Sequence, residues 1–248
     1  MRRIMLRVAY DGTGYSGWQE QENAVTIESE LNKALGLITG EEISVIGASR
    51  TDAGVHAEGA VCVFDTDSRI PAEKFSYAAN TRLPEAVRVV ESSEVDPEFH
   101  PRHCNSEKTY EYRIWNDKFD NPLMTRYTHF IYRDMDVNAM NEAAQCLVGE
   151  HDFKSFCSTK AEVLTTVREV VSVRVERDSQ ESRLIKITVT GKGFLYNMVR
   201  IIAGTLIEVG TGLRTVESVR EALEAVDREA AGPTAPAKGL VLKKMVFL

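Results

Sequence analysis

The run Ile4-Met-Leu-Arg-Val-Ala-Tyr10 decides how the first half of the chain folds, because its aliphatic residues recur at every second position. That alternation is typical of a β-strand with one buried face. The period then changes: Thr26 is a favoured helix N-cap residue. After it, apolar residues follow at helical spacing at Ile27, Leu31, Leu35 and Ile38. The chain therefore begins with a strand and a helix.

The same patterns continue through the rest of the chain. In the first half we expect strands at 43–49, 60–64 and 87–90, and a second helix with Pro71 in its first turn. In the second half we expect strands at 109–115, 168–176, 184–190 and 240–247, and helices at 137–147, 195–209 and 216–226. Each half reads β-α-β-β-α-β. This order predicts an α+β protein of two ferredoxin-like halves, with antiparallel sheets packed around a central cleft.

We place the boundary between the halves where strand character lapses, giving residues 1–103 and 104–248, the latter with an added helix. The chain has 248 residues, and no stretch approaches the ~20 apolar residues that a membrane span needs. The four cysteines form no CxxC pair, and the histidines show no metal-ligand spacing. We expect a cytoplasmic protein that holds no metal.

The formal net charge of -7 argues mildly against binding of nucleic acid, whose affinity comes largely from neutralised phosphates. The location of charge matters more than its sum. A nucleic-acid-binding protein of this composition would need a basic cleft on an acidic body.

One short segment, Arg50-Thr-Asp52-Ala-Gly54-Val-His56, places a cation, a carboxylate and an imidazole close together. Arg50 is positioned to keep Asp52 ionised, which suits a nucleophile or a base. The alternative is an ordinary loop, with Asp52 in a side-chain turn and Arg50 as its surface ion pair.

Three other segments contain candidate residues. The glycine-rich loop 11–19 carries Tyr15 and Trp18, which are candidates to stack on bases. The alternative for Trp18 is that its side chain fills the core. Tyr110 lies on a predicted strand, where tyrosine is common in any protein. Arg200 falls off the apolar stripe of its helix, and so reaches either a cleft or solvent.

Taken together, these segments resemble the tRNA pseudouridine synthase A family. The matching pieces, in order, are Asp11-Gly-Thr-x-Tyr-x-Gly-Trp-Gln19, Gly47 to Ala57, Phe99-His-Pro-Arg102, Lys108-Thr-Tyr-x-Tyr112, His151-Asp-Phe-x-Ser-Phe156, and Phe194 with Met198-Val-Arg200. They span almost the whole chain. One departure is Ser49, where many members of the family have glycine.

The resemblance implies conversion of uridine to pseudouridine on the 3′ side of the tRNA anticodon arm. It also implies no cofactor, no metal, and a homodimer with one tRNA lying across both subunits. Asp52 matches the essential catalytic aspartate, Tyr110 the tyrosine that contacts the substrate, and Arg50 the basic residue beside the aspartate. Arg200 matches an arginine expected near that carboxylate. Arg102 and Phe194 lie in matching segments and are expected to bind substrate.

Two other functions stay open on the residues alone. A non-catalytic tandem RNA-binding protein would use exposed aromatics and a basic sheet face. A glycoside-type hydrolase would use Asp11 and Asp52 as paired carboxylates. The route of a synthase is open as well: Asp52 attacks C1′ or C6 of the nucleotide, or removes the C2′ proton.

Overall fold

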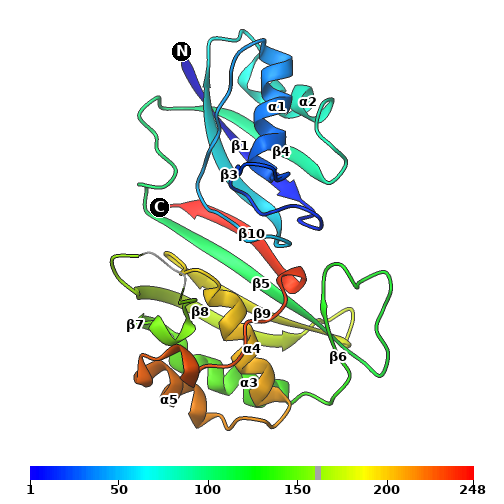
Figure 1. Cartoon of the computed structure of the whole chain (residues 1–248), viewed down its shortest axis with the longest axis vertical. Coiled ribbons are helices and arrows are strands. Elements are labelled where there is room, and N and C mark those ends of the chain that lie inside the picture. Colours follow the sequence, from blue (N-terminus) through cyan, green and yellow to red (C-terminus); the bar gives the residue numbers. More distant parts are fainter. Residues whose placement is uncertain (160–162) are drawn as a thin grey trace. The chain divides into compact units, whose positions relative to one another are not determined.

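The computed structural model describes residues 1–159 and 163–248, which divide into two compact units (Figure 1). The first unit contains Met1–Asn105 together with Leu242–Leu248, and the second contains Ser106–Val241. Each unit combines α-helices with strands that pair mostly antiparallel, so the protein has a mixed α/β fold.

The first unit begins with the predicted strand and helix. Its elements are β1 (Arg2–Tyr10), α1 (Ile27–Thr39), β2 (Ile46–Gly47), β3 (His56–Thr66), a 3₁₀ turn (Ala72–Lys74), α2 (Phe75–Asn80) and β4 (Val87–Val95). The central strand β1 is antiparallel to β3 on one side and to β4 on the other, and β2 is antiparallel to β3. Ile4, Leu6 and Val8 are fully buried, which confirms the alternation read from the sequence.

Helix α1 starts where its cap residue predicts. The Thr26 hydroxyl accepts a hydrogen bond from the Ser29 backbone N–H, and the Ser29 hydroxyl accepts one from the Thr26 backbone N–H. This reciprocal pair satisfies backbone donors that the first turn leaves free. The predicted residues Ile27, Leu31 and Leu35 are buried. The helix ends at Gly40, whose φ of 75° is left-handed.

The second unit has a longer list of elements. They are β5 (Ser106–Asn116), β6 (His129–Ile131), α3 (Val137–Ala144), β7 (Gly149–Asp152), β8 (Val167–Arg177), β9 (Leu184–Gly191), α4 (Met198–Gly210) and α5 (Glu217–Ala225), with 3₁₀ turns at Gln145–Leu147, Lys154–Phe156, Arg228–Ala230 and Ala237–Gly239. The strand order is β5-β9-β8-β7, all antiparallel, and β6 runs parallel beside β5. Helix α3 contacts β8, α4 and α5, and α4 contacts β5 (Figure 1).

Four elements differ from the predictions. The expected strand at 43–49 shrinks to β2, because the Val45 N–H donates to the Asn32 side chain and not to a neighbouring strand. Strands β6 and β7 were not predicted, since three or four residues are too few to display an alternating pattern. Helix α4 begins at Met198 because Asn197 before it has a left-handed φ of 62°.

The last strand, β10 (Leu240–Phe247), is divided between the units, and most of it belongs to the first. It neighbours β3 in the sheet, and Lys243 forms an ion pair with Glu58 there. The rings of Phe247 and Phe99 pack edge to face at 5.0 Å. Chain order places this strand in the C-terminal half, but order alone does not indicate which sheet a strand joins.

In the part of the chain that the structure describes, no helix has the length and apolar character needed to cross a membrane.

Candidate functional site

Asp52 lies in the loop that connects β2 to β3 and is half-buried. The Val55 N–H donates to the Asp52 carbonyl at 3.1 Å, which closes a tight turn. Gly54 occupies that turn with a φ of 76°, a left-handed conformation that favours glycine. The sequence therefore folds the backbone sharply just after the carboxylate.

The loop 11–19 holds the Asp52 loop by its backbone. The Trp18 N–H donates to the Thr51 carbonyl at 3.0 Å, and the Gly54 N–H donates to the Tyr15 carbonyl at 3.3 Å. The buried hydroxyls of Tyr10 and Thr51 are hydrogen bonded at 2.8 Å. Residues on both sides of Asp52 are thus fixed to a second segment.

Two glycines of the loop 11–19 make this close approach possible. A Cβ atom on Gly17 would lie 2.7 Å from the Thr51 carbonyl oxygen, and one on Gly12 would lie 2.1 Å from the Val55 carbonyl oxygen. Real side chains do not come so near to backbone. These glycines therefore let the two loops pack together.

Trp18 belongs to the core. Its side chain is 1% exposed, and its indole lies against Gly47, where a Cβ atom would be 2.4 Å from the ring nitrogen. Of the two roles left open by the sequence, the structure decides for core packing. Trp18 cannot stack on a base in this position.

His56 and Asp11 form a contact that sequence reasoning missed. His56 is buried, and its Nδ1 lies 3.2 Å from Asp11 Oδ1 and accepts the Gly12 N–H at 3.0 Å. Asp11 Oδ1 also accepts the Thr13 N–H at 2.9 Å. The pair joins the end of the Asp52 loop to the start of the loop 11–19. Both residues lie in segments singled out above, but no spacing rule pairs two positions so far apart in the chain.

Arg50 and Arg102 differ in how they are held near Asp52. Arg50 is exposed, and its side chain makes no hydrogen bond or ion pair with any residue that the structure describes. The ion pair expected between Arg50 and Asp52 is therefore not formed. Arg102 donates from Nε to the Gly47 carbonyl at 2.8 Å, so it braces the strand that leads into the loop.

In the second unit, Tyr110 and Phe194 form one aromatic pair. Tyr110 lies on β5 opposite Val189 of β9 and is 7% exposed. The Tyr110 and Phe194 rings pack edge to face, with their centroids 5.2 Å apart and their planes at 84°. Gly191 leaves room for this pair, since a Cβ atom there would lie 3.1 Å from the Phe194 ring.

Arg200 is held in place and is not a solvated side chain. It lies in the first turn of α4, half-buried, and donates from Nε to the Ala235 carbonyl and from Nη1 to Asn197 Oδ1, both at 2.8 Å. Burial raises the pKa of the neighbouring Tyr112 phenol, an effect that the Arg200 charge partly opposes. Arg200 thus presents a fixed guanidinium beside β5.

Among residues 1–159 and 163–248, no three His, Cys, Asp or Glu side chains are grouped as a metal site would require. The chemistry available to these residues is that of a carboxylate, arginines and aromatic rings.

The comparison with known proteins agrees with the motifs. The family model described as tRNA pseudouridine synthase matches residues 7–103 and 143–247. The chain belongs to this family. A relative named tRNA pseudouridine synthase A from Brevibacillus brevis is 47% identical over 247 residues, which is 100% of both chains. One of the same name from Acetivibrio thermocellus is 43% identical over the same coverage, and a tRNA pseudouridine synthase A 2 from Clostridium tetani is 45% identical over 99% of both chains.

The family match covers five of the six candidate residues. Arg50, Asp52 and Arg102 fall in its first segment, and Phe194 and Arg200 fall in its second. Tyr110 lies between the two segments, so its assignment rests on its own motif and on its contact with Phe194.

Proposed function

We propose that this protein isomerises uridine to pseudouridine in tRNA. The observation that carries the proposal is the family match, which holds over both units and along the full length of relatives named for this activity. By family resemblance, the target uridines lie on the 3′ side of the anticodon arm. The reaction breaks the N1–C1′ bond and forms a C5–C1′ bond, while C5 loses a proton and N1 gains one.

Asp52 is the proposed catalytic carboxylate. Its loop is fixed on both sides by backbone hydrogen bonds, and such support is what a reacting group needs to hold its geometry. The carboxylate attacks C1′ or C6, or removes the C2′ proton, and each route is consistent with an ionised Asp52.

The remaining candidates are proposed to bind the substrate. A uridine inside a stem must leave its stack, which costs a few kcal/mol. Arg50 is exposed and uncommitted among the described residues, which supports a role in filling the vacated space. Tyr110 and Phe194 offer an aromatic pair to the uracil ring, a contact of about 1–3 kcal/mol. Tyr110 is also our candidate base for the C5 proton.

Arg102 and Arg200 are proposed to contact the tRNA backbone or the target nucleotide. The two arginines are each anchored through Nε to a carbonyl oxygen, so their guanidinium groups are already oriented. Guanidinium groups bind phosphate oxygens well because their donors form a planar fork.

We further propose that both halves are ferredoxin-like, with residues 1–103 forming the catalytic half and 104–248 the second half, and that α5 is an addition. The order β4-β1-β3, with β2 paired to β3, supports this for the first unit. A cytoplasmic homodimer, with one tRNA lying across both subunits, is the proposed working form.

Release of tritium from tRNA labelled at uridine C5 tests the function. A synthase releases tritium and keeps the base attached, a hydrolase leaves an abasic ribose, and an RNA-binding protein does neither. We expect Asp52→Asn and Asp52→Ala to abolish release while tRNA is still bound. The control is Asp67→Asn, which removes an exposed carboxylate of the same unit. Turnover of Asp52→Ala near that of the control would refute the assignment.

A further inference from the structure

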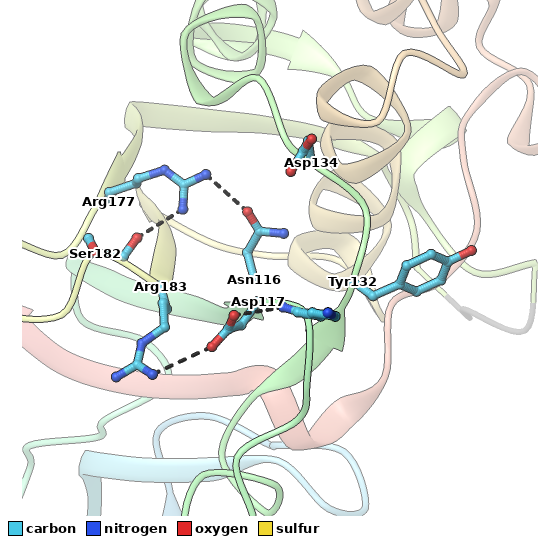
Figure 2. Close-up of a pocket in the computed structure, with 8 residues that line it drawn as sticks. Asn116, Asp117, Tyr132, Asp134, Arg177, Ser182 and Arg183 are labelled. Atoms are coloured by element: carbon cyan, nitrogen blue, oxygen red, sulfur yellow. Dashed lines mark hydrogen bonds and ion pairs between the residues drawn. The ribbon is translucent and has the colours of Figure 1, made fainter.

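A polar pocket with a volume of about 450 Å³ lies in the second unit (Figure 2). None of the residues that line it is assigned to the reaction. It is formed where β5 and β8 end, where β9 begins, and by the segment after β6. Figure 2 shows Arg177 and Arg183 on one side of this pocket and Tyr132 on the other. The motifs and the proposed reaction leave these residues without a role.

The arginines of the pocket differ in how their charge is compensated. Arg183 pairs with Glu181 at 2.7 Å and with Asp117 at 3.5 Å, so carboxylates surround it. Arg177 donates to the Asn116 side-chain oxygen at 3.0 Å and to the Ser182 carbonyl at 2.9 Å. Both of those acceptors are neutral, so Arg177 is oriented but its charge is not neutralised.

Two more cations lack a carboxylate partner among the described residues: Lys118, which lines the pocket, and Arg133, which lies between the lining residues Tyr132 and Asp134. Lys118 lies over the Phe119 ring at 5.4 Å, and Arg133 lies over the Tyr132 ring at 5.9 Å. Against these and Arg177 stands Asp134, a carboxylate that is likewise without a partner in the described part of the chain. With Arg183 and its partners Glu181 and Asp117 included, four cations face three carboxylates, so this surface carries one excess positive charge on a chain whose formal net charge is -7.

Aromatic side chains border this positive charge. Phe119 is 71% exposed and Tyr132 is 66% exposed, so both rings are accessible to a ligand. Trp115 is buried beneath Arg183, and its indole N–H donates to the Phe119 carbonyl at 3.2 Å, which fixes the backbone of that segment. An exposed ring beside an uncompensated cation suits a base stacked on the ring and a phosphate at the cation.

We propose that this pocket binds an unstacked nucleotide of the tRNA, in addition to the target uridine. Tyr132 stacks on its base and Phe119 on the base next to it, and Lys118, Arg133 and Arg177 contact the flanking phosphates. A protein partner fits less well, because burying three cations without partners is costly. The inference rests on the proposed function, since it takes tRNA as the substrate.

Equilibrium binding of unmodified tRNA tests the aromatic contacts. We expect Tyr132→Ala and Phe119→Ala each to weaken binding by between about 5-fold and 150-fold, the range of one base–aromatic stack. The KM for tRNA should rise with the Kd. The matched control is Tyr77→Ala in the first unit, where a ring 70% exposed also has a lysine, Lys74, over it at 5.0 Å. Its Kd should equal that of the wild type.

Salt dependence tests the phosphate contacts. The slope of log Kd against log salt should become shallower by about 0.7 for each lost contact with a single strand, hence by about 1.4 in the Lys118→Ala/Arg133→Ala variant. Lys74→Ala is the control and should keep the wild-type slope. Wild-type Kd and slope in the pocket variants would overturn the inference and point to a protein ligand. Tritium release by the wild-type protein tests the proposed function separately, because its outcome does not depend on how tightly the pocket variants bind tRNA.

Discussion

Replacing Gly17 by alanine should displace the loop that carries Asp52 without removing any polar group. A Cβ atom at Gly17 would lie 2.7 Å from the Thr51 carbonyl oxygen, whereas ordinary contacts begin near 3.4 Å. The opposing atom is backbone and cannot rotate away, so the loop that carries Asp52 must retreat by about 0.7 Å. Misplacement of a reacting group by about 1 Å can lower a rate about 100-fold. We therefore expect kcat to fall by about 10- to 100-fold.

The chain supplies its own control in Gly14. Its φ of +81° is close to the +91° of Gly17, but no atom lies within 4 Å of the Cβ position. In both alanine variants, the left-handed backbone lowers the free energy of unfolding by about 1–2 kcal/mol. That cost should lower either melting temperature by a few degrees in a protein of this size. Only Gly17→Ala adds the collision with the Asp52 loop.

Tritium release at saturating tRNA, measured beside thermal unfolding, separates the two effects. Gly14→Ala should keep nearly all of its kcat, and Gly17→Ala should lose most of it. If the two variants share the same kcat, the contact between the loops does not set the position of Asp52, and the reasoning above is refuted.

Two further predictions concern charged side chains. Arg50→Gln should leave the melting temperature within about 2 °C, because an exposed side chain without partners contributes little stability. It should lower kcat/KM by about 10- to 100-fold, while Arg69→Gln, at another exposed site of the same unit, should change neither value. Lys186→Met should raise the pKa of Asp178, which is held at about 2 chiefly by the Lys186 hydrogen bond and then by two backbone N–H groups. Since this pKa lies below the unfolded value, the stabilisation is complete above about pH 4 and is lost as the pH falls through 2; an NMR titration of the carboxyl group measures the change.

Local sequence signals predicted the helices and longer strands well. The Thr26 cap and the spacing of Ile27, Leu31 and Leu35 place α1 correctly, because capping and burial of one helix face act over a few residues. The sequence did not indicate where β10 belongs, since strand pairing depends on residues far away in the chain.

In the candidate site as well, the sequence did not predict contacts that depend on the folded backbone or on distant residues. Proximity in sequence suggested an ion pair between Arg50 and Asp52, but the Arg50 side chain is exposed and does not form it. The sequence left open whether Arg200 reaches a cleft or solvent, because nothing local reveals that the Ala235 carbonyl accepts a hydrogen bond from its Nε. The pairing of His56 with Asp11 is another contact between distant segments.

The joining of Leu242–Leu248 to the first unit has a consequence for how the protein is made. On the ribosome, residues 1–105 emerge long before the segment that neighbours β3 has been synthesised. Until then β3 has an edge that only the two residues of β2 cover, and such an edge can pair with other chains. The unit that holds Asp52 is therefore completed last although it is translated first.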